Sequence, residues 1–204
     1  MMFYQQKESG FSLVETLVAI SILLIVIVGP MTISMQSAKS ASFASEQVQA
    51  FFLAQEGLEL AQKARDELLL NSNLFGGTET SPWGKFSTAS APNPYHLCHS
   101  SFVGCGLIWN NTTPQNLAPA VDCTIPANCR LHLRNTDQPS VRSHFSHTVT
   151  DSTPTPFTRR IYFESTSTGE AVKVRSVVTW RTGSIVAEQK VEVDTYLYNI
   201  YDTP

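Results

Sequence analysis

Glu15 is the one charged residue in the apolar stretch at residues 11–35. A helix of that length rises about 37 Å, enough to cross a bilayer core of about 30 Å. A carboxylate near the start of a spanning helix is costly and usually marks a functional position. We therefore treat Glu15 as a candidate functional residue, and the apolar stretch as the element that must position it.

Three interpretations of this N-terminus are open. A conventional secretory signal peptide needs a basic n-region and a small-residue cleavage site, but Lys7 is offset by Glu8 and the region after the apolar stretch offers a poor site. A plain membrane anchor leaves Glu15 unexplained. The third interpretation is a leader that is cut before the apolar segment, which would leave the apolar helix on the mature chain.

The run Gly10-Phe11-Ser12-Leu13-Val14-Glu15 resembles the processing site of type IV prepilins and pseudopilins. The resemblance implies that a prepilin peptidase cuts after Gly10 and N-methylates Phe11. It also implies that Glu15 pairs with the terminal amine of a neighbouring subunit and sets the axial register of assembly. The pairing is physically reasonable, because each charge offsets the other's desolvation in an apolar surrounding.

After residue 35 the pattern predicts an amphipathic continuation of the helix, ending near residues 71–73. We expect this half to pack on a globular head, with Phe51 and Phe52 in the core. One predicted stripe contains Ala44, Val48, Phe51 and Leu58, and a neighbouring row of mostly small residues contains Ala54, Gly57, Ala61, Ala64 and Leu68.

Gly29 and Pro30 interrupt the apolar half and predict a helix break, because proline removes a backbone hydrogen bond and clashes with the preceding turn. The break is either a simple kink or, as the resemblance to pilins implies, a site of local melting on assembly.

The four cysteines form a second group that could do chemistry: Cys98, Cys105, Cys123 and Cys129. An even, clustered count indicates disulfides in an exported protein or a small metal site. Short separations favour the pairs Cys98–Cys105 and Cys123–Cys129, while crossed and nested pairings stay open. A zinc site lacks the tight C-x2-C spacing, so we predict no metal.

Histidines near these cysteines offer further metal-ligand atoms. His99 and His132 would complete a zinc site if the cysteines were reduced. We instead expect His96, His99, His144 and His147 to be surface residues.

Residues 157–200 are predicted to form an antiparallel meander with strands near 158–165, 172–180 and 185–198, because apolar and polar residues alternate. The alternation places Trp180 on the apolar face. Lys173, Arg175 and Arg181 line the other face, with Arg159 and Arg160 nearby in sequence. This basic strip would either form cross-strand ion pairs with Glu188 or Glu192, or contact DNA or anionic sugars.

The composition is poor in charge. Charged residues make up 15% of the 204 and the net charge is −3, against about 25% charged residues in an average soluble domain. The strongly basic surface of most nucleic-acid binders is therefore not predicted. We find no hydrolase elbow, phosphate-binding loop, dinucleotide fingerprint or metalloprotease helix, so we predict neither an enzyme nor a cofactor.

These patterns predict an α+β, pilin-like fold in which one long N-terminal helix packs its C-terminal half on an antiparallel β-sheet. We expect a cleaved leader at residues 1–10, a transmembrane and filament-core helix half at 11–35, an amphipathic half at 36–72, a variable Cys-containing segment at 73–156 and the sheet of the globular head at 157–204.

The resemblance implies a structural subunit of a type IV pilus-like filament, a minor pilin or pseudopilin. The implied partners are a prepilin peptidase, other pilin subunits through helix packing, an inner-membrane assembly platform with its ATPase, and membrane lipid before assembly. The chain would begin as a single-pass inner-membrane protein with its head outside the cytoplasm, and end in an extracellular or periplasmic filament. The alternative is a tip or adhesin-type minor subunit whose variable segment binds a surface, DNA or a secreted substrate, with nucleic acid the less favoured partner.

Overall fold

The structure is a computed structural model that describes residues 10, 12–70, 82–89, 93–108, 120–134, 143–183 and 187–200. The predicted leader at residues 1–9 and the predicted methylation position Phe11 lie outside the described residues. The chain divides into two compact units, Met1–Ser45 and Glu46–Pro204.

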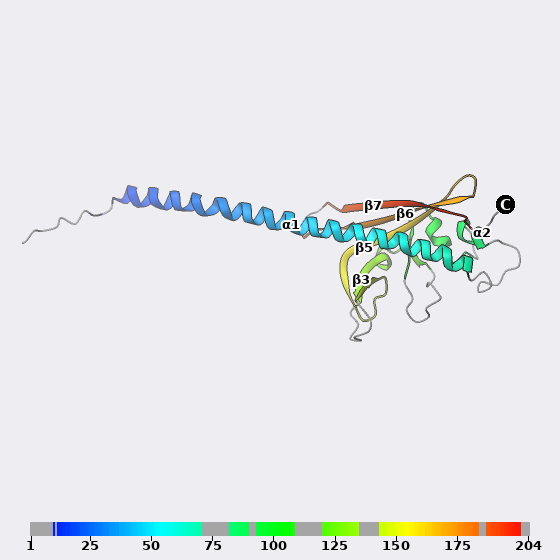
Figure 1. Cartoon of the computed structure of the whole chain (residues 1–204). Helices are drawn as coiled ribbons and strands as arrows, with labels where there is room; N and C mark the ends of the chain where they lie inside the picture. Colours follow the sequence, from blue (N-terminus) through cyan, green and yellow to red (C-terminus); the bar gives the residue numbers. More distant parts are fainter. Residues whose placement is uncertain are drawn as a thin grey trace, which may run out of the picture. The chain divides into compact units, whose positions relative to one another are not determined.

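Helix α1 (Leu13–Leu70) is 58 residues long and contains the division between the two units (Figure 1). It passes through Gly29 and Pro30 as continuous α-helix, so the helix does not end at these residues, and a kink there stays a prediction. Proline removes one backbone hydrogen bond and crowds the preceding turn, and the helix continues on either side of it. The Thr32 hydroxyl donates to the Gly29 carbonyl oxygen at 2.8 Å. Melting at this point on assembly remains a prediction.

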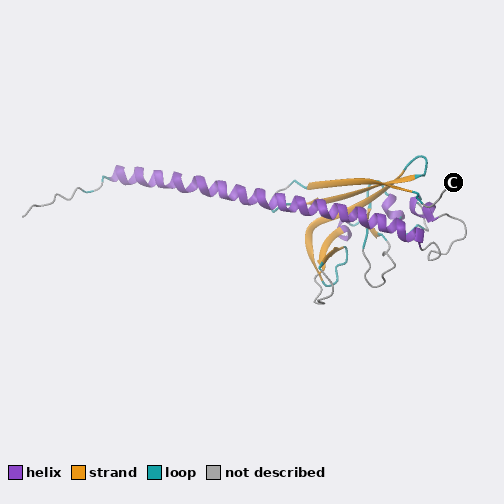
Figure 2. Ribbon diagram, in the orientation of Figure 1, coloured by secondary structure: helices purple, strands orange, loops and turns teal. Residues whose placement is uncertain are grey.

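The second unit contains an antiparallel sheet, as predicted. Its described strands are seven, and three of them form the long meander (Figure 2): β5 (Ser152–Ser165), β6 (Ala171–Trp180) and β7 (Gln189–Tyr198). Strand β5 pairs with β6 from Thr158↔Thr179 to Ser165↔Val172, and β6 pairs with β7 along its whole length. The fold is therefore α+β and pilin-like, with one long helix and an antiparallel sheet.

Between α1 and β5, the described residues form the other strands and three short helices. The helices are α2 (Pro82–Ser87) and the 3-10 helices η2 (His96–His99) and η3 (Pro126–Cys129); the strands are β1 (Cys105–Gly106), β2 (Val121–Asp122), β3 (Arg130–Arg134) and β4 (His144–Ser146). The strand order is β2-β1-β5-β3-β4. The sheet thus begins well before residue 157, because β5 is long enough to pair with β3 through its first half and with β1 through its second.

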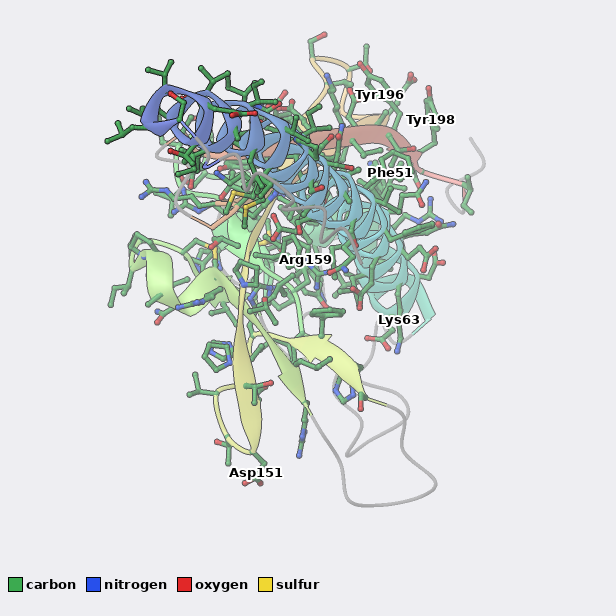
Figure 3. All side chains as sticks on the ribbon, turned by 90° about the vertical axis from the view of Figure 1, so that its left-hand side faces the viewer. Phe51, Lys63, Asp151, Arg159, Tyr196 and Tyr198 are labelled. Atoms are coloured by element: carbon green, nitrogen blue, oxygen red, sulfur yellow. A yellow bond between two sulfur atoms is a disulfide. The ribbon has the colours of Figure 1, made fainter. Side chains whose placement is uncertain are left out.

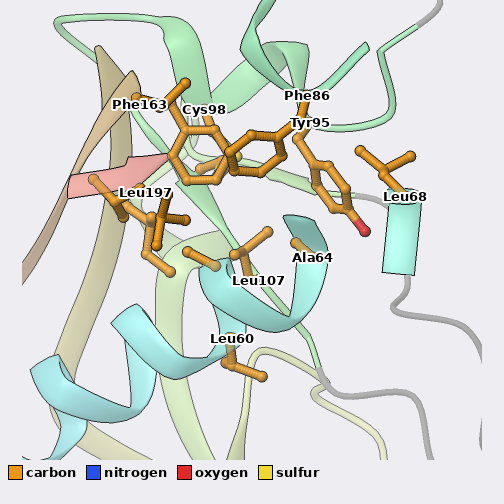
Figure 4. Close-up of a cluster of buried hydrophobic side chains, with 14 of the residues drawn as sticks. Leu60, Ala64, Leu68, Phe86, Tyr95, Cys98, Leu107, Phe163 and Leu197 are labelled. Atoms are coloured by element: carbon orange, nitrogen blue, oxygen red, sulfur yellow. A yellow bond between two sulfur atoms is a disulfide. The ribbon is translucent and has the colours of Figure 1, made fainter. Parts of the chain in front are cut away.

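The core of the second unit lies between α1 and the sheet (Figure 4). Leu60, Ala64 and Leu68 of α1 meet side chains from β5, β6, β7 and the segment before them. Phe86 of α2 stacks against Phe163 of β5 with ring centroids 5.0 Å apart. The buried set of the helix matches the predicted row of small residues, since Ala54, Gly57, Ala61, Ala64 and Leu68 are all buried.

Two predictions about burial are wrong. Phe51 and Phe52 are 43% and 62% exposed, because the sheet approaches the helix along the row of small residues and leaves the larger aromatic side chains outside it. His147 is buried rather than on the surface, since the loop after β4 folds it against Gly106 of β1. Trp180 is buried as predicted.

Candidate functional site

The first helical turn follows directly on the predicted cleavage point. Gly10 is exposed, and a side-chain carbon built on it would meet nothing within 4 Å. The Ser12 carbonyl oxygen accepts the N–H groups of Glu15 at 2.9 Å and Thr16 at 3.2 Å, which starts the helix. The Gly10–Phe11 bond therefore lies just before regular helix, where glycine allows the backbone to lie flat in a peptidase cleft.

Glu15 lies in the first turn of α1 and is exposed. A carboxylate at this position is favoured by the positive end of the helix dipole. Among the described residues, no cation forms an ion pair with it. The carboxylate is thus available to a partner outside the single chain.

The apolar half of α1 presents large side chains on all sides. Leu13, Ile25 and Ile33 are 76%, 74% and 68% exposed. A helix that is apolar all round belongs in a membrane or among other helices. The described helix Leu13–Leu68 is long and apolar enough to cross a membrane. Its most apolar 18 residues have a mean hydropathy of 2.6 and are 0% buried.

Two hydroxyl groups near the start of this half are satisfied by the helix itself. Thr16 Oγ1 donates to the Leu13 carbonyl oxygen at 2.9 Å, and Ser21 Oγ donates to that of Leu17 at 2.8 Å. Since unsatisfied polar groups are costly in lipid, these bonds keep the segment compatible with a bilayer. The Glu15 carboxylate, by contrast, has no ion-pair partner among the described residues.

In the second unit, Arg159 of β5 holds the docked part of α1 on the sheet. Its Nη1 donates to the Leu53 carbonyl oxygen at 3.1 Å and to Glu56 Oε2 at 2.9 Å. The Arg159 side chain is 1% exposed and that of Glu56 is 38% exposed. Burial lowers the pKa of the Arg159 guanidinium, and the Glu56 carboxylate partly offsets the effect. Figure 3 shows Arg159 on the side of the sheet that α1 covers.

Two further contacts define how closely this part of the helix lies on the sheet. A side-chain carbon added at Gly57 would collide with Ser176 Oγ of β6 and would lie 3.2 Å from Arg159 Cδ. The helix can approach this closely because the position has no side chain. Further toward the N-terminus, the Thr182 hydroxyl donates to the Glu46 carboxylate.

The cysteines form two disulfides, Cys98–Cys105 and Cys123–Cys129, with Cα–Cα distances of 4.6 and 5.4 Å. This is the pairing that short separations favour. With the sulfurs bonded to each other, the thiolate ligands of the alternative zinc site are absent. The first disulfide joins η2 to β1 within the core, and the second closes the turn that contains η3.

The predicted basic strip divides between two faces of the sheet. Lys173 and Arg175 lie on the outer face and form ion pairs: Lys173 with Asp194 at 2.9 Å, and Arg175 with Glu164 at 3.1 Å and Glu192 at 3.5 Å. These are cross-strand pairs, one of which uses the predicted partner Glu192. The mutual interaction raises the pKa of Lys173 and lowers that of Asp194.

The sequence places Arg159 with that basic strip. This placement is wrong, because the Arg159 side chain contacts Leu53 and Glu56 of α1. A signal for this exists in the sequence. Phe157, Arg159, Ile161 and Phe163 occupy alternate positions of one strand, so they share a face, and that face is apolar. An arginine in such a row requires a carboxylate from the packed element, and Glu56 supplies it.

The chain matches the family model of the prokaryotic N-terminal methylation motif at residues 5–29, the type IV prepilin signature. No curated protein and no solved structure matches the chain. The matched range includes Gly10, Phe11 and Glu15 and ends at Gly29. The motif indicates a type IV pilin-like protein, a structural rather than an enzymatic role, and a membrane anchor formed by the apolar helix.

Proposed function

We propose that the chain is a minor pilin or pseudopilin subunit of a type IV pilus-like filament. A prepilin peptidase cuts the chain after Gly10 and N-methylates Phe11. The helix half at residues 11–35 first spans the inner membrane, with the head outside the cytoplasm, and then packs with the helices of other subunits. The observation that carries the proposal is a methylation motif that extends into an apolar helix, and no described part of the chain buries that helix.

The exposed Glu15 supports a role in assembly. Cleavage before Phe11 would create a new cationic amine four residues from this carboxylate. A neighbouring subunit's amine would offset the desolvation of Glu15 and fix the axial offset between two helices, as a buried polar residue does in a coiled coil. A pair of this kind stabilises one axial register between two helices among the many that an apolar helix surface allows.

Leaving the membrane requires work that this chain cannot supply. The large exposed side chains of the apolar half are stabilised by lipid, at about 25 cal/mol per Å² of apolar surface. Extraction therefore implies an assembly platform and an ATPase as partners. Packing among other pilin helices would restore the lost burial once the subunit joins the filament.

The direct test is mass spectrometry, without reductant, of the native protein from sheared filaments and from membranes. The expected mature chain begins at N-methylated Phe11, is found in the sheared fraction, and is lighter by four hydrogens than the reduced chain because of its two disulfides. Its abundance relative to other pilins separates a minor from a major subunit. A chain that still begins at Met1, confined to membranes of a host with active prepilin peptidase, would overturn the proposal.

A matched pair of glycine variants strengthens this test. Gly10→Val places a branched side chain at the cleavage point and is expected to leave the protein unprocessed and absent from filaments. Gly29→Ala changes a glycine in the apolar helix whose surroundings are equally open, and should be processed normally. Equal processing of both variants would contradict the assigned cleavage site.

A further inference from the structure

A cavity of about 460 Å³ opens on the outer face of the sheet, beyond the filament role proposed above. It lies between η3, the middle of β5 and the end of β6, and its lining includes Arg130, Thr158, Thr179, Arg181 and Glu188. The volume falls within the range of about 300–1,000 Å³ that is typical of small-molecule sites. None of the contacts that dock α1 on the sheet uses this cavity.

The strand register brings the polar side chains to one place. Arg130 of β3 pairs with Thr158 of β5, and Thr158 pairs with Thr179 of β6. Residues that face each other across neighbouring strands project to the same face of a sheet. A guanidinium and two hydroxyl groups therefore form one row across three strands. Arg181, directly after β6, lines the same cavity.

The two arginines differ from Lys173, Arg175 and Lys190 on the same face. Lys173 and Arg175 are neutralised by cross-strand carboxylates, and Lys190 contacts Glu192 at 2.5 Å. Arg130 and Arg181 are exposed, and neither forms an ion pair with any residue in the described part of the chain. Carboxylates thus neutralise Lys173, Arg175 and Lys190, whereas the two arginines that line the cavity have no ion-pair partner among the described residues.

Arg130 is also held in place. Its Nε donates to the Thr155 carbonyl oxygen at 2.7 Å, which leaves the two terminal nitrogens of the guanidinium for a ligand. A guanidinium with a fixed orientation suits the planar, two-oxygen geometry of a carboxylate. The site is therefore pre-organised for an anionic group at the Arg130 side.

The rest of the lining favours a sugar around that anion. Pro126 and Pro156 supply apolar surface for the C–H faces of a saccharide ring, while Thr158 and Thr179 supply hydroxyl groups that donate and accept hydrogen bonds. Glu188 can accept hydrogen bonds from sugar hydroxyls.

We propose that this cavity binds a carboxylate-bearing saccharide, with Arg130 and Arg181 on the carboxylate and the threonines and Glu188 on the hydroxyl groups. A DNA strand fits less well, because its internal deoxyribose rings carry no free hydroxyl groups to which Thr158, Thr179 and Glu188 could bond. The ligand would be an acidic polymer on a surface that the subunit meets.

The test uses the purified full chain in non-ionic detergent and titrates it with tri-galacturonate by isothermal calorimetry. Binding is expected, and Arg130→Gln and Arg181→Gln should each weaken it at least tenfold. Lys173→Gln removes a cation of the same face that already has a carboxylate partner, and should leave the affinity unchanged. Glu188→Gln should strengthen binding severalfold, because it removes a nearby negative charge.

Three probes separate the sources of binding. A neutral galactose trisaccharide and acetate alone should each bind at least tenfold more weakly than tri-galacturonate. The proposal is overturned if tri-galacturonate does not bind at millimolar concentration, if both arginine variants bind as tightly as the native chain, or if a single-stranded DNA dodecamer binds as tightly with the same dependence on the arginines. Because the assay needs neither processing nor assembly, its failure would leave the filament proposal standing.

Discussion

The two parts of α1 on either side of Ser45 differ in the size and distribution of their apolar side chains. The first part carries large side chains all round, and every residue described from Leu13 to Ser42 is exposed. The second part carries small residues along one face, and Ala54, Ala61 and Ala64 are each 0% exposed. One helix is thus suited to two surroundings.

The comparison shows that side-chain size determines whether a part of the helix packs on its own chain or on other surroundings. Small residues allow a sheet to approach the helix backbone closely, so the second part finds its packing partner within the chain. Large branched side chains in all directions leave a surface that only lipid or other helices can cover. The predictions below change one part at a time and measure whether the other responds.

The largest effect is expected from a comparison of two glutamates on the same helix. Removing one partner of a buried ion pair costs about 3–5 kcal/mol, which is more than a hundredfold in an equilibrium constant. If Glu15 pairs with a neighbouring amine, Glu15→Ala should reduce incorporation into sheared filaments more than a hundredfold, measured by quantitative mass spectrometry. The thermal midpoint of the head should not change.

Glu56→Ala is the matched control. Glu56 already has a partner, Arg159, within the second unit. Its removal leaves a buried guanidinium without its carboxylate, so the head should lose stability, while cleavage after Gly10 should proceed normally. The division of roles is wrong if Glu15→Ala assembles like the native chain.

The next largest effect concerns the disulfides, which lie only in the second unit. Each closes a short loop, and the chain-entropy account gives about 2–3 kcal/mol for loops of this size. Replacing Cys98 and Cys105 together by serine should lower the free energy of unfolding of the head by that amount or more, since both are fully buried. Replacing Cys123 and Cys129 provides the comparison at the edge of the core.

Circular dichroism in detergent separates the two units in this experiment. The double variants should lower the unfolding midpoint of the sheet and leave the signal of the apolar helix half unchanged. Loss of helix in both units of a double variant would contradict the expected independence of the two units.

The features that the sequence predicts well are local ones. The apolar helix, the methylation motif and the alternation in β6 each depend on neighbours within a few residues, so a pattern in the chain is enough to find them. The small-residue row of α1 is predictable for the same reason. The short separations of the cysteines likewise favour the pairing that the structure contains.

The features that sequence analysis misses depend on contacts between distant segments. Nothing near Phe51 in the chain indicates that the sheet meets the neighbouring helix face instead. The burial of His147 requires β1, which lies about 40 residues earlier. The cavity on the outer face needs η3, β5 and β6 together, so neither its shape nor the lack of an ion pair at Arg181 among the described residues could be read from the chain.

A smaller effect is expected from a comparison of two glycines in α1. Gly57→Ala places a carbon against Ser176, and overpacking of this kind costs about 1–3 kcal/mol. Gly29→Ala meets nothing within 4 Å and should not lower the stability of the head. Urea unfolding followed by tryptophan fluorescence measures both.

Ser176→Ala supplies a rescue. Ser176 Oγ is buried and has no hydrogen-bond partner in the described part of the chain, so its removal is cheap. The double variant Gly57→Ala/Ser176→Ala should regain part of the lost stability. No recovery would mean that Arg159 Cδ, rather than the Ser176 hydroxyl, limits the close approach at Gly57.

The smallest effect is a dependence of the head's stability on pH that the apolar helix half should not share. Burial, helped by the nearby Arg159 charge, lowers the pKa of His147 to about 3, against about 6.5 in an unfolded chain. Between these values the unfolded state binds more protons. The free energy of unfolding should therefore fall as the pH falls below about 6.5, by about 1.4 kcal/mol per unit at most.

His147→Gln removes this titration, and His96→Gln, an exposed histidine, is its control. Between pH 7.5 and 5.5 the native chain and the His96 variant should lose about 1.4 kcal/mol more than the His147 variant in urea unfolding. Burial also lowers the pKa of His99, so a residual slope of the same sign should persist in the His147 variant. Equal slopes in all three proteins would show that His147 opens to water in the folded head, since a histidine reached by solvent would titrate alike in the folded and unfolded states.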